Sequence, residues 1–91
     1  MSREPVLVDD PDEIARHLRA HPGVWFLVAR GPLERHNTIK QTGYRIRTNR
    51  LRAFRRNSDP RGRWEVRTTA ALDREDAVAP VEMVARWVSL G

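Results

Sequence analysis

The sequence predicts a small α+β domain, in which one or two helices pack on an antiparallel sheet of three or four strands. Three observations support this fold class: a helix-start pattern at residues 10–13, an apolar run at residues 24–29, and a polar–apolar alternation at residues 63–70. The 91 residues are enough for one domain spanning residues 1–91. We expect segments 1–9 and 71–80 to be loosely ordered.

The first predicted helix covers residues 11–21. Asp10 precedes Pro11, which suits an N-cap residue followed by proline at the first helical position. Apolar residues four positions apart give this helix one side suited to burial. The sequence His-Pro-Gly at residues 21–23 ends it, because the residue before proline is displaced from the helical region.

The apolar run at residues 24–29 follows directly and predicts a strand. It contains β-branched and aromatic residues and is apolar at both alternating positions. Such a run is typical of a central strand that is covered on both faces. Arg-Gly-Pro at residues 30–32 ends it.

Residues 34–49 fit two structures, of which we favour a helix. Asn49 suits the left-handed end of such a helix. However, residues 43–48 also alternate as a strand would, and glycine within a helix costs about 1 kcal/mol relative to alanine. The helical interpretation depends on three residues spaced as on one helix face: Ile39, Gly43 and Ile46.

Two strands joined as a hairpin are predicted at residues 51–56 and 63–70, because the connecting residues 57–62 are rich in turn-forming types. Residues 71–79 are expected to form a polar connection or a short helical turn. The tail, residues 81–88, fits either a helix beginning at Pro80 or a strand. The strand would place on one face Met83, Ala85 and Trp87.

Four short patterns recur in a group of known proteins: Leu-Arg-x-x-Pro-Gly-x-Trp within residues 18–28, Ile-Arg-x-x-x-Leu-x-Ala-Phe-Arg at 46–55, Gly-x-Trp-Glu-Val within 62–67, and Val-Ala-Arg-Trp-Val at 84–88. Through them the chain resembles a largely uncharacterised group of small proteins from actinobacteria and their phages. The likeness covers most of residues 12–90. It implies a helix at 34–49 and a strand in the tail, and it implies no activity.

A weaker likeness is to the three-stranded arm-type DNA-binding domains of phage integrases. It is carried by residues 43–47, 51–55 and 64–67. This second likeness implies a strand at residues 44–47 and a helix in the tail, and so a basic sheet that reads DNA.

Positive charge is concentrated in the middle of the chain. Residues 30–67 have a net charge of +9, whereas residues 1–29 and 68–91 each have −2. Such segregation attracts a polyanion to one region of a molecule. On the predicted hairpin, arginines would follow a phosphate backbone. The candidate nucleic-acid-binding residues are Lys40, Tyr44, Arg45, Arg47, Arg50, Arg52, Arg55, Arg56, Arg61, Arg63 and Arg67.

Two aromatic residues in this segment have competing interpretations. Phe54 would share a hairpin face with arginines and could stack on a base, but we favour a place in the core. Tyr44 lies at helical spacing between Lys40 and Arg47, in a basic stripe that suits a groove or a solvated helix face equally well.

The sequence contains no feature that predicts catalysis or a bound cofactor. Cysteine is absent, no serine has a neighbouring base, and there is no glycine-rich phosphate loop. His17 and His21 are four residues apart but lack a third ligand, so we expect no metal site. The lack of cysteine, a signal peptide and a 20-residue apolar segment leads us to expect a cytoplasmic protein without a membrane partner, in the host cytoplasm if a phage encodes it.

The sequence therefore favours a non-catalytic accessory protein that binds DNA or RNA through residues 40–67. The alternative is a small adaptor or inhibitor of a host protein, whose contacts would be the basic surface or any exposed tryptophan among Trp25, Trp64 and Trp87. A homodimer and a structural virion component are also compatible with the sequence.

Overall fold

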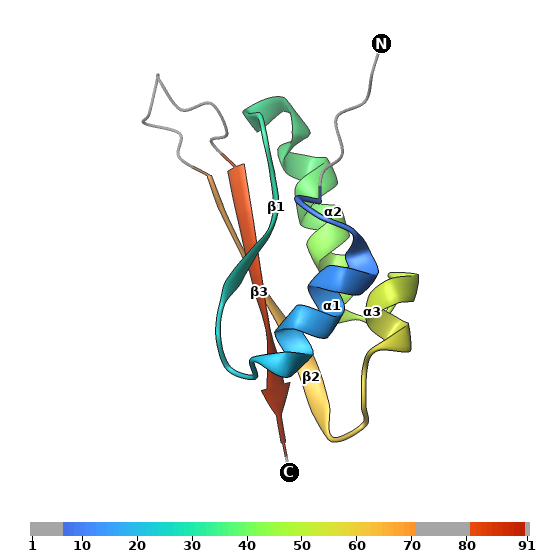
Figure 1. Ribbon diagram of the computed structural model, residues 1–91. Helices are drawn as coiled ribbons and strands as arrows, with labels where there is room; N and C mark the ends of the chain where they lie inside the picture. Colours follow the sequence, from blue (N-terminus) through green and yellow to red (C-terminus); the bar gives the residue numbers. More distant parts are fainter. Residues whose placement is uncertain (1–6, 71–80, 91) are drawn as a thin grey trace.

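The structure is a computed structural model that describes residues 7–70 and 81–90. Its three strands form one antiparallel sheet in the order β1-β3-β2, and the helices lie together on one side of it (Figure 1). The α+β fold class is confirmed. The elements are α1 (Pro11–Ala20), β1 (Phe26–Gly31), the 3-10 turn η1 (Leu33–Arg35), α2 (His36–Arg47), α3 (Arg52–Arg56), β2 (Gly62–Ala70) and β3 (Val81–Ser89).

Helix α1 confirms the first predicted helix. Asp10 is at the N-cap position and Pro11 is the first helical residue, but the Asp10 carboxylate makes no capping hydrogen bond. Instead, the Asp10 carbonyl accepts the first helical bond from the Ile14 N–H at 3.0 Å. The turn after the helix requires Gly23, whose φ of +80° is rarely adopted by other residues.

Strand β1 lies at an edge of the sheet, so the predicted central strand at residues 24–29 is wrong in its position. Strand β3 is central instead. A register shift between Leu27 and Ala29 turns the neighbouring residues Val28 and Ala29 both inward, where both are fully buried. Val24 is 48% exposed. The unbroken apolar run at residues 24–29 is therefore explained by a β-bulge and not by burial of both faces of the strand.

Helix α2 confirms the helical interpretation of residues 34–49. Ile39, Gly43 and Ile46 are all buried, and Asn49 has a left-handed φ of 59°. A Cβ atom on Gly43 would lie 2.7 Å from the Met83 Sδ atom. Glycine at this position therefore lets the helix approach the sheet closely.

Strand β2 confirms the predicted strand at residues 63–70, but the predicted hairpin is wrong, because residues 52–56 form the one-turn helix α3 instead of its first strand. The neighbouring residues Ala53 and Phe54 are both buried, which a strand with one buried face would not allow. The Phe54 ring is fully buried, as the core interpretation predicted, and packs edge-on against Trp64 at 5.0 Å between ring centroids. The true partner of β2 is β3, which lies far away in sequence.

The tail forms strand β3, so its strand interpretation is confirmed. Met83, Ala85 and Trp87 share the buried face toward the helices, as the alternation predicted. The strand at 44–47 and the tail helix that the integrase-type likeness implies are therefore both contradicted. The expectation for residues 71–79 lies outside the described residues.

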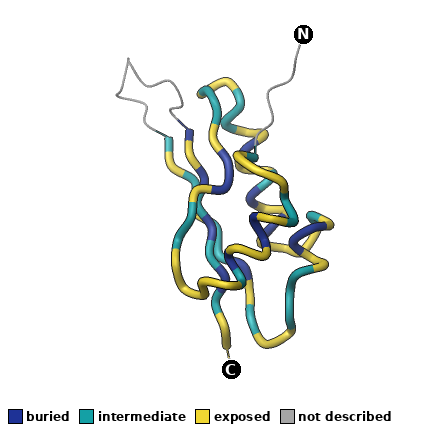
Figure 2. The backbone as a smooth tube through the Cα atoms, viewed as in Figure 1, coloured by how far each residue is buried: buried dark blue, intermediate teal, exposed yellow. Residues whose placement is uncertain are grey.

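The core lies between the helices and the sheet, where the buried segments of the chain face each other (Figure 2). Its centre is a chain of edge-on aromatic contacts from Phe54 to Trp64 and from Trp64 to Trp87. No helix packs on the opposite face of the sheet in residues 7–70 and 81–90 (Figure 1). Polar side chains of β2 and β3 therefore face solvent there.

Candidate functional site

All eleven residues predicted to bind nucleic acid are exposed, but they do not lie together on one hairpin. Helix α3 carries Arg52, Arg55 and Arg56, because this segment is helical. Arg56 is also paired with the Asp12 carboxylate of α1 at 3.5 Å. Arg61 lies in the loop before β2. The three arginines of α3 therefore do not lie on a strand beside the arginines of β2.

Arg45 also points away from the other candidate residues of α2. It follows the buried Gly43 by two positions, or about 200° around the helix, and so lies on the side turned from the sheet. Its side chain is exposed, and it does not line the hollows that adjoin β2. Arg45 is therefore a natural control for the residues on the sheet side.

Of the remaining candidates, Lys40, Tyr44 and Arg47 line a groove between α2 and β2, which we call the α2–β2 groove. Its volume is about 360 Å³. Tyr44 is 47% exposed, and the guanidinium groups of Arg47 and Arg50 lie 5.8 and 5.7 Å from its ring centroid. These distances are within the range of cation–π attraction. The groove is lined by Lys40, Gly43, Tyr44, Arg47, Val66 and Thr68.

A second hollow of about 430 Å³ adjoins the α2–β2 groove, and Arg47 lines both. It contains Trp25, whose ring centroid lies 4.5 Å from the Arg86 guanidinium and 4.9 Å from that of Arg67. The two hollows thus form one surface around β2. We call it the cationic surface and define it by Trp25, Lys40, Tyr44, Arg47, Arg50, Arg63, Arg67 and Arg86.

The register of the sheet explains why three arginines of this surface, Arg63, Arg67 and Arg86, share one face of the sheet. In β2, Arg63 and Arg67 are four positions apart and point away from the helices, whereas Trp64 between them is buried. Arg86 lies on β3 directly opposite Glu65. Alternation along two paired strands therefore places three guanidinium groups on the face that no helix covers.

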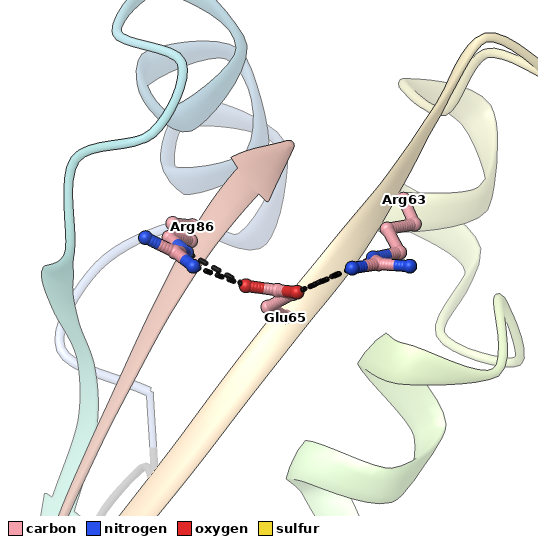
Figure 3. A network of polar contacts seen from close by, with 3 residues as sticks. All are labelled: Arg63, Glu65 and Arg86. Carbon is pink, nitrogen blue, oxygen red and sulfur yellow. Dashed lines mark hydrogen bonds and ion pairs between the residues drawn. The ribbon is translucent and has the colours of Figure 1, made fainter. Parts of the chain in front are cut away.

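One carboxylate, that of Glu65, lies between two of these arginines (Figure 3). Its Oε1 atom accepts hydrogen bonds from Arg86 at 2.7 Å, and its Oε2 atom accepts two from Arg63, at 2.9 and 3.3 Å. The bond from Arg86 and, to a lesser extent, that from Arg63 hold the pKa of Glu65 below its ordinary value, although partial loss of hydration opposes this shift. Glu65 is therefore ionised at neutral pH and partly neutralises both guanidinium groups.

Two members of the cationic surface, Trp25 and Arg86, lie outside the basic segment 30–67 and were not among the predicted nucleic-acid-binding residues. The position of Arg86 could have been predicted from the tail, because alternation along a strand places its side chain on the face opposite to that of Met83 and Ala85. No local pattern indicated that Trp25 would contact Arg67, because the contact runs from the residue before β1 across β3 to β2. The other two tryptophans, Trp64 and Trp87, are 2% and 4% exposed.

The histidines of α1 form a packed cluster instead of an open ligand set. The His17 ring lies 4.5 Å from that of His21 and 4.3 Å from that of Phe26, between centroids. The His21 Nδ1 atom is also 3.0 Å from the His17 carbonyl. No group of three ligating side chains suited to a metal occurs in the part of the chain that the structure describes.

None of the described helices is long and apolar enough to cross a membrane. The chain matches no family model, and no curated protein or solved structure is significantly similar to it.

Proposed function

We propose that this protein binds nucleic acid, without catalysing a reaction, through the cationic surface. The observation that carries this proposal is the continuous surface on which six basic side chains surround two accessible aromatic rings. Among the described residues that line its two hollows, Glu65 is the only one with a carboxylate. Arginine suits phosphate, because its planar guanidinium group can donate two parallel hydrogen bonds.

The distribution of tryptophan favours nucleic acid over the protein-binding alternative. Trp64 and Trp87 are buried and cannot serve as contacts for a partner. Trp25 is half-buried beside two guanidinium groups, so its surroundings are charged rather than apolar. A large apolar patch, which often marks a protein partner, is therefore not formed by these three residues.

The test compares two charge-matched variants of α2, Arg47→Gln and Arg45→Gln. We expect wild-type protein to bind an oligonucleotide at low salt and to lose affinity steeply as salt rises, because phosphate contacts release counterions. Arg47→Gln should lower the affinity several-fold and reduce the slope of log affinity against log salt by about 0.7–0.9, the value for one phosphate contact. Arg45→Gln should change both quantities much less.

Fluorescence anisotropy titrations at four or more salt concentrations measure both quantities. The proposal is wrong if wild-type protein does not bind at low salt, or if binding is insensitive to salt. Equal losses in Arg47→Gln and Arg45→Gln would show that binding follows net charge instead of this surface.

A second prediction concerns Glu65, whose carboxylate competes with phosphate for Arg63 and Arg86. We expect Glu65→Gln to bind an oligonucleotide several-fold more tightly than wild type at pH 7, since both guanidinium groups are released. The difference should disappear as the pH falls through the Glu65 pKa, because the wild-type carboxyl then becomes neutral too. As this pKa lies below the ordinary value, convergence requires a pH lower than for a free glutamate.

Titrations of both proteins at several pH values and constant ionic strength check this prediction. Glu82→Gln is the control, because Glu82 is an exposed carboxylate of the same strand as Arg86 but has no part in the Arg63–Glu65–Arg86 network. An equal gain in oligonucleotide affinity in Glu65→Gln and Glu82→Gln would indicate a general effect of net charge.

A further inference from the structure

We propose that the ligand is single-stranded and that one unpaired base stacks on Tyr44 in the α2–β2 groove. This inference depends on the proposed function and specifies the class of nucleic acid. It starts from the exposure of Tyr44, which is 47% although the ring borders a groove with apolar lining atoms. A π-face that is both accessible and flanked by apolar atoms suits a nucleobase.

The groove exists because α2 comes close to β2 at Gly43. A Cβ atom there would lie 2.9 Å from the Val66 Cγ1 atom, so helix and strand are in contact at this point. Gly43 and Val66 supply apolar lining, and the Thr68 side chain adds a hydroxyl that can donate or accept a hydrogen bond. The groove thus offers an apolar site together with one polar group that could contact a base edge.

Basic groups stand on both sides of Tyr44 along the helix. Lys40 precedes Tyr44 by four residues and Arg47 follows it by three, so all three side chains share one helix face. Lys40 and Arg47 are about 10 Å apart along the helix axis, at 1.5 Å per residue. A strand lying along α2 would therefore meet a positive charge before and after the base that occupies the groove.

The same geometry disfavours a duplex. In a duplex the bases are stacked on one another, and only their edges and the phosphates are accessible. The π-face of Tyr44 would then have no base to stack on. Proteins that bind single strands instead combine a positively charged groove with aromatic rings, which is the combination found here.

The test uses a labelled single-stranded oligo-dT, the same strand annealed to its complement, and three variants of Tyr44. Tyr44→Phe keeps the π-face, Tyr44→Leu keeps apolar bulk without it, and Tyr44→Ala removes both. We expect the wild type to bind the single strand more tightly than the duplex. Tyr44→Ala and Tyr44→Leu should weaken single-strand binding by about 5- to 150-fold, the equivalent of one stacked base, and Tyr44→Phe should retain it.

Anisotropy titrations at one low salt concentration measure these affinities, and circular dichroism checks that each variant is folded. Equal binding of single strand and duplex, or unchanged affinity in Tyr44→Leu and Tyr44→Ala, would overturn the inference. In that case a loss in Arg47→Gln would still support the proposed function. If the wild type binds neither probe, the proposed function itself fails, and the inference fails with it.

Discussion

Replacing Phe54 with alanine should lower the free energy of unfolding by about 3–5 kcal/mol, the usual loss for a fully buried phenylalanine. Phe54 has no exposed surface, and its ring packs edge-on against Trp64. The Phe54 carbonyl also accepts a hydrogen bond from the Trp64 indole N–H at 3.3 Å. Because domains of this size are stable by only about 5–15 kcal/mol, the variant should be partly unfolded at moderate temperature.

Urea denaturation followed by tryptophan fluorescence measures this loss. Phe54→Leu is the matched control, because it keeps an apolar side chain in the same site and should lose clearly less stability. A loss below about 1 kcal/mol for Phe54→Ala would contradict the buried position, since such small values are typical of surface residues.

The second large effect is expected at the start of β2. A Cβ atom on Gly62 would lie 2.2 Å from the Trp87 Cζ2 atom and 2.7 Å from the Val88 carbonyl oxygen. The Trp87 ring is itself confined by Trp64, at 4.7 Å between centroids, so it cannot move aside freely. We therefore expect Gly62→Ala to cost about 3 kcal/mol or more, at the upper end of overpacking effects.

Thermal unfolding of Gly62→Ala should show a correspondingly lower midpoint. Gly31→Ala is a suitable comparison, since its Cβ atom would meet only the flexible Ile39 Cδ1 end at 3.2 Å and the Arg35 Cβ atom at 3.8 Å. We expect a much smaller change there. Equal midpoints for the two variants would show that Gly62 is not closely packed against Trp87.

The elements that local sequence predicts correctly are those whose signals are complete within a few residues. Helix α1 has proline and an N-cap residue at its start, and a glycine turn after its end. Helix α2 has a full apolar stripe and ends before Asn49, which adopts the left-handed conformation expected of it. In both cases the deciding interactions lie within one or two helical turns.

The segment 51–56 was mispredicted because its burial depends on distant partners. Taken alone, its apolar residues fit a strand as well as a single helical turn, and six residues are too few for periodicity to distinguish the two. The helix is favoured because β2 pairs with β3 instead of with this segment. Residues 51–56 can then cover the aromatic core, where Phe54 contacts Trp64. The edge position of β1 was missed for the same reason, since strand order is a property of the whole sheet.

The candidate site likewise has properties that are local in the sequence and properties that depend on the tertiary structure. By itself, the sequence determined that positive charge is concentrated in residues 30–67 and that Lys40, Tyr44 and Arg47 share one helix face, because net charge and helical spacing are local properties. Only the tertiary structure decided which arginines lie together. The pairing of β2 with β3 brings Arg86 to the surface of Arg63 and Arg67, and the pairing of β1 with β3 brings Trp25 there. The helical turn of α3 removes Arg52, Arg55 and Arg56 from the strand on which they were predicted. The physical reason is that long-range strand pairing and core burial, rather than spacing along the chain, place these side chains in space.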